Sequence, residues 1–241
     1  MCTVSFYNTG NEIIITSNRD EKVIRSQSTM PIEECDKDEH VIYFAKDTQA
    51  FGTWFVTDNL GRVAVLLNGA FVKHQSEGSY KKSRGVVLLE LFKEKIFFNA
   101  FENYSLKNIE PFQILFYQNN VLQRFLWDGE KKHVEFLNTL KSYIFSSVTL
   151  YETNIIEERK IWFHQFVSKN EELNNKMILD FHLHHHKHDL QNGLTINRTN
   201  EAKTFSISQV VINPENNTYT YLDLLNNNST AKVIELLQAH Q

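Results

Sequence analysis

The residue best suited to chemistry is Cys2, provided that the initiator methionine is removed. Methionine aminopeptidases remove Met1 when the next side chain is small, as cysteine is. Cys2 would then carry a thiol and a free α-amine, whose ordinary pKa values of about 8.5 and about 7.7–8.0 lie near physiological pH. One residue would supply a nucleophile and a base, the requirements of covalent catalysis. A lone cysteine is, however, more often a small buried apolar residue.

A hairpin would return a charged segment to Cys2. The apolar residues at 4–6 and 13–15 flank turn-forming residues at 8–11, which predicts two short strands. The second strand leads into Asn18-Arg19-Asp20-Glu21, so we expect this cluster to lie beside Cys2. The same cluster is equally compatible with a solvated turn.

A second polar residue stands at the end of a predicted strand. Residues 51–57 and 62–68 are strand-like and flank turn chemistry at 58–61. The second of these strands is almost continuously apolar, so both of its faces should be covered. Asn68 at its end either points into a site or is simply a strand-end turn residue.

Several short segments of the chain occur in a characteristic order: Met1-Cys2-Thr3-Val4, Asn18-Arg19-Asp20-Glu21, Gly52-Thr53-Trp54, residues 61–68 and Ser83-Arg84-Gly85. This ordered set resembles the NRDE (transport and Golgi organisation protein 2-like) family. The resemblance is dense over residues 1–90 and thin afterwards. This family in turn resembles the cysteine N-terminal nucleophile hydrolases of the choloylglycine hydrolase and penicillin acylase type, which also begin Met-Cys-Thr.

The resemblance implies a fold and a mechanism. The fold is a four-layer αββα sandwich (α/β, α+β), formed by residues 1–241 as one domain. In the mechanism, the Cys2 thiolate attacks a carbonyl while the α-amine relays the proton. Arg19 stabilises the thiolate and positions the amine, and Asp20 hydrogen-bonds that amine. Asn68 donates to the oxyanion, a contribution of about 10²–10³ in rate. The residues assigned to substrate binding are Asn18, Trp54 and Ser147.

The chain departs from its relatives at two points. Where the family usually has Ser-Asn, this chain has Ser146-Ser147, and a hydroxyl is shorter and offers one donor where an amide offers two. The choloylglycine hydrolase type spaces its Arg and Asp three apart, whereas Arg19 and Asp20 are adjacent. Adjacent side chains on a strand point to opposite faces, so Asn18 or Glu21 could take one of these roles.

The remaining pattern predicts a mixed α/β chain. Residues 22–50 are polar and predicted to be irregular, and residues 73–84 form a polar loop that could cover the site. Helices are predicted from Gly85 toward Phe98, over 99–110, over 157–167 and over 231–238. Strands are predicted at 112–117, 121–129, 132–136, 204–212 and 218–223.

Composition narrows the protein class. The 241 residues are 41% hydrophobic and 22% charged, values typical of a single globular domain. A net charge of −4 gives no electrostatic footprint for nucleic acid. No apolar run reaches the roughly 18–20 residues of a membrane span. Two cysteines and no secretory signal pattern predict a reducing, cytoplasmic location. The oligomeric state stays open.

Two segments suggest metal ligands, but we expect neither to form a site. The acidic run 33–39 with Cys35 and His40 matches no standard ligand spacing. The stretch 181–189 holds five histidines and is expected to be a surface turn with adventitious affinity. There is also no Cys-x-x-Cys-His haem motif. The sequence therefore predicts no resident metal and no cofactor.

Two functions remain. The first is a hydrolase or acyltransferase acting on an amide or thioester bond of a small molecule. The alternative is a non-catalytic protein of lipid or haem handling, or of trafficking, on the same scaffold. A processed, activated Cys2 favours the enzyme, and a buried or unprocessed Cys2 favours the binding protein. The substrate cannot be read from the sequence.

Overall fold

Two antiparallel β-sheets form the centre of the computed structural model, which describes residues 2–25, 27–35, 39–75 and 78–237. The first sheet has the order β10-β1-β2-β12-β13-β14, with β11 beside β12, and the second runs β3 to β9 in chain order. The first contains β1 (Cys2–Asn8), β2 (Ile13–Lys22), β10 (Tyr143–Ser146), β11 (Asn197–Arg198), β12 (Ala202–Ile212), β13 (Asn216–Asp223) and β14 (Asn228–Glu235). The second contains β3 (Ile32–Cys35), β4 (Val41–Phe44), β5 (Phe55–Asp58), β6 (Val63–Asn68), β7 (Phe112–Gln118), β8 (Val121–Trp127) and β9 (Lys132–Leu137).

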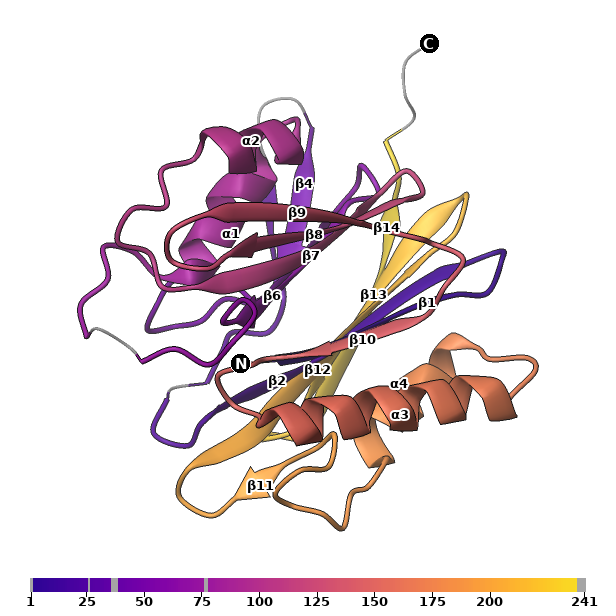
Figure 1. Cartoon of the computed structure of the whole chain (residues 1–241). Coiled ribbons are helices and arrows are strands. Elements are labelled where there is room, and N and C mark those ends of the chain that lie inside the picture. The colour runs from indigo at the N-terminus through magenta and orange to yellow at the C-terminus, as the bar shows by residue number, and fades with distance from the viewer. Residues whose placement is uncertain (1, 26, 36–38, 76–77, 238–241) are drawn as a thin grey trace.

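Helices cover the outer face of each sheet (Figure 1). Helices α1 (Arg84–Lys93) and α2 (Phe97–Asn103) pack on the second sheet, while α3 (Thr153–Lys169) and α4 (Asn175–His184) pack on the first. A third apolar cluster lies between the two sheets. The expected four-layer αββα sandwich is therefore confirmed.

Strand periodicity assigns each residue near the amino terminus to one of two layers. In β1, Cys2, Val4 and Phe6 point into the core between the sheets. In β2, Ile13 and Ile15 join that core, whereas Ile14 packs against the helices. Because both faces of this sheet are covered at β1 and β2, these two strands are buried over almost their whole length, unlike strands with one wet face.

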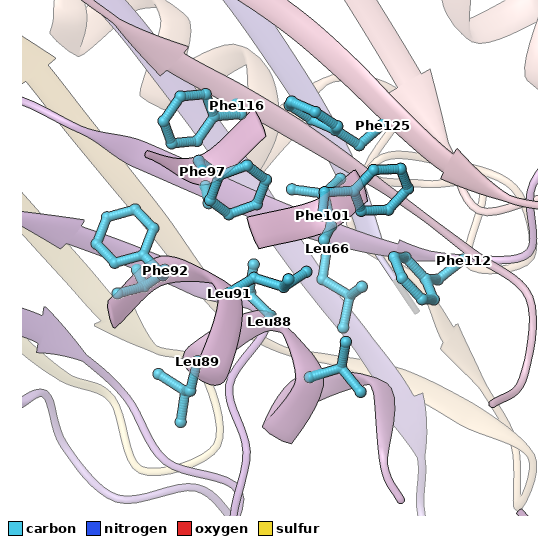
Figure 2. Packing of buried hydrophobic residues seen from close by; sticks show 14 of the residues in the cluster. Leu66, Leu88, Leu89, Leu91, Phe92, Phe97, Phe101, Phe112, Phe116 and Phe125 are labelled. Carbon is cyan, nitrogen blue, oxygen red and sulfur yellow. The ribbon is translucent and has the colours of Figure 1, made fainter. Parts of the chain in front are cut away.

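Phenylalanine rings fill the layer between α1, α2 and the second sheet (Figure 2). Phe97 stacks on Phe116 with ring centroids 4.3 Å apart and meets Phe125 edge-on at 5.0 Å. Phe101 also meets Phe125 at 5.0 Å. Such pairs add about 0.5–1.5 kcal/mol each to the free energy of area burial. Part of the aromatic richness of the sequence thus serves to attach these two helices.

Several sequence predictions of secondary structure were wrong. Residues 22–50 contain β3 and β4, and the exposure of β3 alternates as on an edge strand. Residues 231–235 of the predicted last helix belong instead to β14, which pairs with β13, and residue 238 lies outside the described residues. Only Ile234 of that strand is buried, so pairing with β13 outweighed local propensity. The predicted first helix ends at Lys93 and is followed by the separate α2.

The histidine-rich stretch is not simply a surface turn. Its first part forms the last turn of α4, and His182 there is completely buried. Among the described residues no group of three or more His, Cys, Asp or Glu could hold a metal ion. Residues 36–38 of the acidic run lie outside the described residues. No described helix is long and apolar enough to cross a membrane.

A buried hydrogen-bond chain joins α4 to the first sheet. Both N–H bonds of the Asn18 side chain go to the carbonyls of His182 and Leu194, so its Oδ1 accepts from His182 Nδ1. His182 Nε2 then accepts from the Ser5 hydroxyl at 2.6 Å. Burial, together with the nearby Arg159 charge, lowers the pKa of His182 to about 3. The imidazole is therefore neutral in the folded protein.

We expect Phe97→Ala to lower the free energy of unfolding by about 3–5 kcal/mol, because it removes a fully packed ring. Phe98, its neighbour in α2, is 38% exposed, so Phe98→Ala should cost less than about 1.5 kcal/mol. Urea denaturation of both variants measures the difference, and equal losses would contradict the packing described here.

The low pKa of His182 predicts an acid-sensitive fold. Below about pH 6.5 the unfolded state takes up a proton that folded His182 excludes, so stability falls with pH until the folded pKa near 3. This group should cost about 1.5 kcal/mol between pH 6.5 and 5. Denaturation of the wild type across that range should show the loss, and His182→Gln should remove it. His184→Gln, at an exposed position of the same helix, should keep it.

Candidate active site

Cys2 and Arg19 stand directly opposite each other on β1 and β2. Cross-strand partners lie on the same face of a sheet, so both side chains enter the layer between the sheets. The Arg19 guanidinium lies 4.1 Å from the centre of the Trp54 ring, and its Nη2 donates to Asp47 at 2.8 Å. The hairpin predicted from the sequence therefore forms, and Arg19 is the residue it brings to Cys2.

The thiol of Cys2 is completely buried. Burial raises its pKa, and the carboxylates of Asp20 and Glu21 raise it further, while the Arg19 charge acts in the opposite direction. In this structure, therefore, the protonated thiol is the favoured form at neutral pH. Arg19 is the side chain of the hairpin that favours the thiolate.

Asp20 and Asn18 occupy the other face of β2. Asp20 accepts hydrogen bonds from Tyr151 at 2.7 Å and Thr204 at 2.6 Å. Burial raises the pKa of Asp20, and the Arg159 charge and these two hydrogen bonds oppose the shift. Asn18 belongs to the His182 hydrogen-bond chain. Neither residue lines the cavity of about 310 Å³ that opens beside Arg19.

Ser147 connects the Cys2 strand to the end of β6. Its N–H donates to the carbonyl of Cys2 at 2.9 Å, and its hydroxyl donates to the carbonyl of Asn68 at 2.9 Å. The serine that replaces the family's asparagine thus has a fixed structural role and does not line the cavity. Through it, Cys2 and Asn68, which are far apart in sequence, share one hydrogen-bonded neighbour.

A cavity of about 310 Å³ opens beside Arg19. Arg19, Trp54 and Asn68, all proposed from the sequence, lie in its wall, whereas Cys2 is not among the lining residues. From the loop 73–84, which the sequence suggested as a cover, the later residues 80 and 82–84 lie in the wall. Residues 76–77 of that loop lie outside the described residues. The other lining residues are Glu21, Arg25, Asp47, Ala50, Gly52, Thr53, Leu66, Tyr80, Lys82, Ser83, Arg84, Gly85 and Glu110.

Two glycines let the start of α1 approach the loop before β5. A Cβ on Gly52 would lie 2.2 Å from the carbonyl carbon of Gly85, and a Cβ on Gly85 would lie 2.7 Å from the Thr53 oxygen. The Thr53 N–H donates to the Gly85 carbonyl at 3.2 Å. The Gly-Thr-Trp and Ser-Arg-Gly segments are therefore two sides of one backbone contact, which positions Trp54 over the cavity.

Sequence reasoning missed the acidic partners of the site. Asp47 lies between predicted elements, where no periodicity marks it. Burial alone would raise its pKa, but the N–H groups of Ala50 and Gln49 and the charge of Arg19 lower it, so the carboxylate stays ionised beside Arg19.

Sequence reasoning also missed a buried cation. Arg159 in α3 is completely buried, whereas a single cation in an amphipathic helix normally faces water.

Two solved structures that resemble this chain are an amidase and a bile acid hydrolase. A Caenorhabditis elegans ortholog of N-acylethanolamine-hydrolyzing acid amidase has a TM-score of 0.61 at 11% identity, covering 87% of this chain and 92% of that one. A mutant of conjugated bile acid hydrolase from Clostridium perfringens has a TM-score of 0.54 at 13% identity, covering 100% and 99%. At such identities the likeness shows the fold alone, which is that of the N-terminal nucleophile hydrolases.

A search of curated proteins finds no match. The family model described as transport and Golgi organisation 2, in contrast, matches residues 1–231, nearly the whole chain and well beyond the first ninety residues that carried the resemblance. The chain belongs to the transport and Golgi organisation 2 family.

Proposed function

We propose that the protein, once Met1 is removed, is a cysteine N-terminal nucleophile hydrolase or acyltransferase acting on an amide or thioester of a small molecule. The observation that carries the proposal is the pairing of Cys2 with Arg19 beside a cavity of about 310 Å³, on this fold. That volume is in the range of small-molecule sites. The neighbours named as an amidase and a bile acid hydrolase support the same reaction type.

In the proposed reaction, the Cys2 α-amine takes the thiol proton and the thiolate attacks the carbonyl carbon of the substrate. The C–N or C–S bond then breaks, and the leaving group receives that proton. Water, or an acceptor nucleophile, cleaves the acyl–sulfur bond and restores the thiol. Arg19 favours the thiolate, and the Asn68 amide donates to the oxyanion.

The remaining predicted residues act by positioning. Trp54 holds the Arg19 guanidinium from the cavity side. Ser147 fixes the Cys2 carbonyl, so the residue is held from its carboxyl side. Asp20 and Asn18 anchor β2 from the helix side, and Asp20 also acts on the Cys2 thiol through its charge. A working thiol requires reducing conditions, so we assign the enzyme to the cytoplasm.

One observation favours a second function, a binding protein without catalysis. The Cys2 thiol is completely buried and its pKa is raised, whereas a reactive cysteine is partly exposed with a depressed pKa. The cavity would then hold a ligand that never reacts. This alternative needs no removal of Met1.

The state of Cys2 decides between them. For an enzyme, intact mass should show loss of Met1, and iodoacetamide should alkylate Cys2 at least about 10-fold faster than Cys35 at pH 6–7, since rate follows thiolate fraction. Cys35 is exposed and outside any disulfide, so it is an internal reference in the same sample. Peptide mapping separates the two rates. Retained Met1, or labelling of Cys2 no faster than that of Cys35, would leave the binding protein as the function.

Removing the Arg19 charge should raise the pKa of Cys2, because Arg19 lowers it. In the processed protein, Arg19→Gln/Asp47→Asn removes the buried ion pair together and leaves no unpaired carboxylate. We expect the labelling midpoint of Cys2 to move to higher pH. Arg25→Gln is the control, because Arg25 is 3.9 Å from the same carboxylate but partly exposed. An unmoved midpoint in the double variant would remove Arg19 from the mechanism.

A further inference from the structure

We propose that the cavity contains an anion-binding subsite at the amino end of α1, which takes a carboxylate or phosphate group of the ligand. Ser83, Arg84 and Gly85, the first residues of this helix and its cap, line the cavity. The Ser83 hydroxyl accepts from the Val86 N–H, which leaves other N–H groups of the first turn without a partner inside the helix. The ten-residue helix places the positive end of its dipole there.

Two buried donors in the cavity wall also lack an acceptor among the described residues, and neither belongs to α1. Trp54 Nε1 and Arg19 Nη1 are buried and have no hydrogen-bond partner in the described part of the chain. Both residues line the cavity and are at least nine-tenths buried. An indole N–H and a guanidinium N–H can only donate. The missing partner is therefore a hydrogen-bond acceptor.

The unpartnered N–H of the Arg19 guanidinium and the positive end of the α1 dipole favour an anionic acceptor. The cavity wall holds four cations, Arg19, Arg25, Lys82 and Arg84, against three carboxylates, and Lys82 pairs with Glu90 outside the wall. Each carboxylate already has a cation: Asp47 pairs with Arg19, Glu21 with Arg25, and Glu110 with Arg84. The wall thus combines satisfied acidic groups with unsatisfied donors. A ligand carboxylate or phosphate would supply the oxygen atoms that these donors lack.

The donors are held in place before a ligand arrives. The Gly52–Gly85 contact joins the loop that carries Trp54 to the first turn of α1, so donors from two elements keep a fixed separation. Arg84 is held by Glu110 and by the Pro111 carbonyl. Binding therefore needs little ordering of side chains. Under the proposed function, this subsite restricts substrates to acidic amides or thioesters, but anion binding itself requires no reaction at Cys2.

Calorimetric titration of the full chain with inorganic phosphate, pyrophosphate, acetate or succinate, at constant ionic strength, tests the subsite. At least one of these anions should bind more tightly than chloride, and comparison of the phosphate and carboxylate series identifies the preferred group. Trp54→Phe keeps the ring over Arg19 but removes the N–H, and should weaken binding about 3- to 10-fold. Arg84→Gln should weaken it at least about 10-fold, and Glu110 then keeps His74 as a partner.

Lys93→Gln is the matched control, because it removes the same charge at the other end of α1, where Lys93 pairs with Glu34. Its affinity should stay within about 2-fold of the wild type. No binding of any probe above chloride, or unchanged affinity in Trp54→Phe, overturns the subsite. An equal loss in Lys93→Gln and Arg84→Gln would do so too, by reducing the effect to net charge. Cys2→Ala removes the proposed nucleophile but none of the anion donors, so anion binding should persist in this variant. The subsite can therefore be supported even if the proposed reaction at Cys2 fails its own test.

Discussion

The structure depends on the register of β1 against β2. That register sets Cys2 opposite Arg19, and strand alternation then sends every second residue of both strands to the other layer. A slip of one residue would exchange the two sets, placing the thiol among the helices and Thr3 and Ser5 in the apolar core between the sheets. Both faces of this sheet are buried at these strands. The slip would therefore bury polar side chains in the apolar core and apolar side chains among the polar groups of the helix-facing layer. The apolar core and the polar network therefore fix the position of the candidate nucleophile together.

The helix-facing layer contains buried polar and charged groups, each of which requires specific partners. Arg159 donates to Thr3 and to the carbonyls of Asn192 and Gly193, and it stacks on Tyr151 at 3.7 Å. Asp20 lies in the same network through Tyr151. Isolated charges at such depth would be strongly destabilising, so each needs its partners in place. This layer holds β1 and β2 in place from the side opposite the cavity. Its residues therefore matter to the site as much as those in the cavity wall.

The sequence was most informative for strands and hairpins, where local alternation and turn residues determine the structure. The hairpin over residues 2–22 and the meander of β7 to β9 follow from alternation and turn chemistry, and they formed as predicted. The four-layer arrangement needed the resemblance, because periodicity alone indicates only mixed α/β structure. Adjacent Arg19 and Asp20 were expected on opposite faces, and they lie there.

Contacts that depend on the assembled fold could not be predicted from the sequence. β14 has a helix-like composition yet pairs along an edge, and Asp47 reaches Arg19 through a fold-dependent contact. His182 was hidden in a tract of histidines whose other members are exposed or half-buried, such as His186, which stacks on Trp162. No local signal separates a buried histidine from its exposed neighbours in such a tract. These residues become distinguishable only when the sheet that receives them is known.

The glycine contact at the start of α1 has a consequence for how variants of this protein will be read. Gly52 carries no reactive group, yet any side chain there would overlap the backbone of Gly85 and force apart the loop and the helix that form the cavity wall. In a functional screen of substitutions, this position will therefore resemble a catalytic residue. Only abundance or melting data gathered on the same variants will separate lost space from lost chemistry.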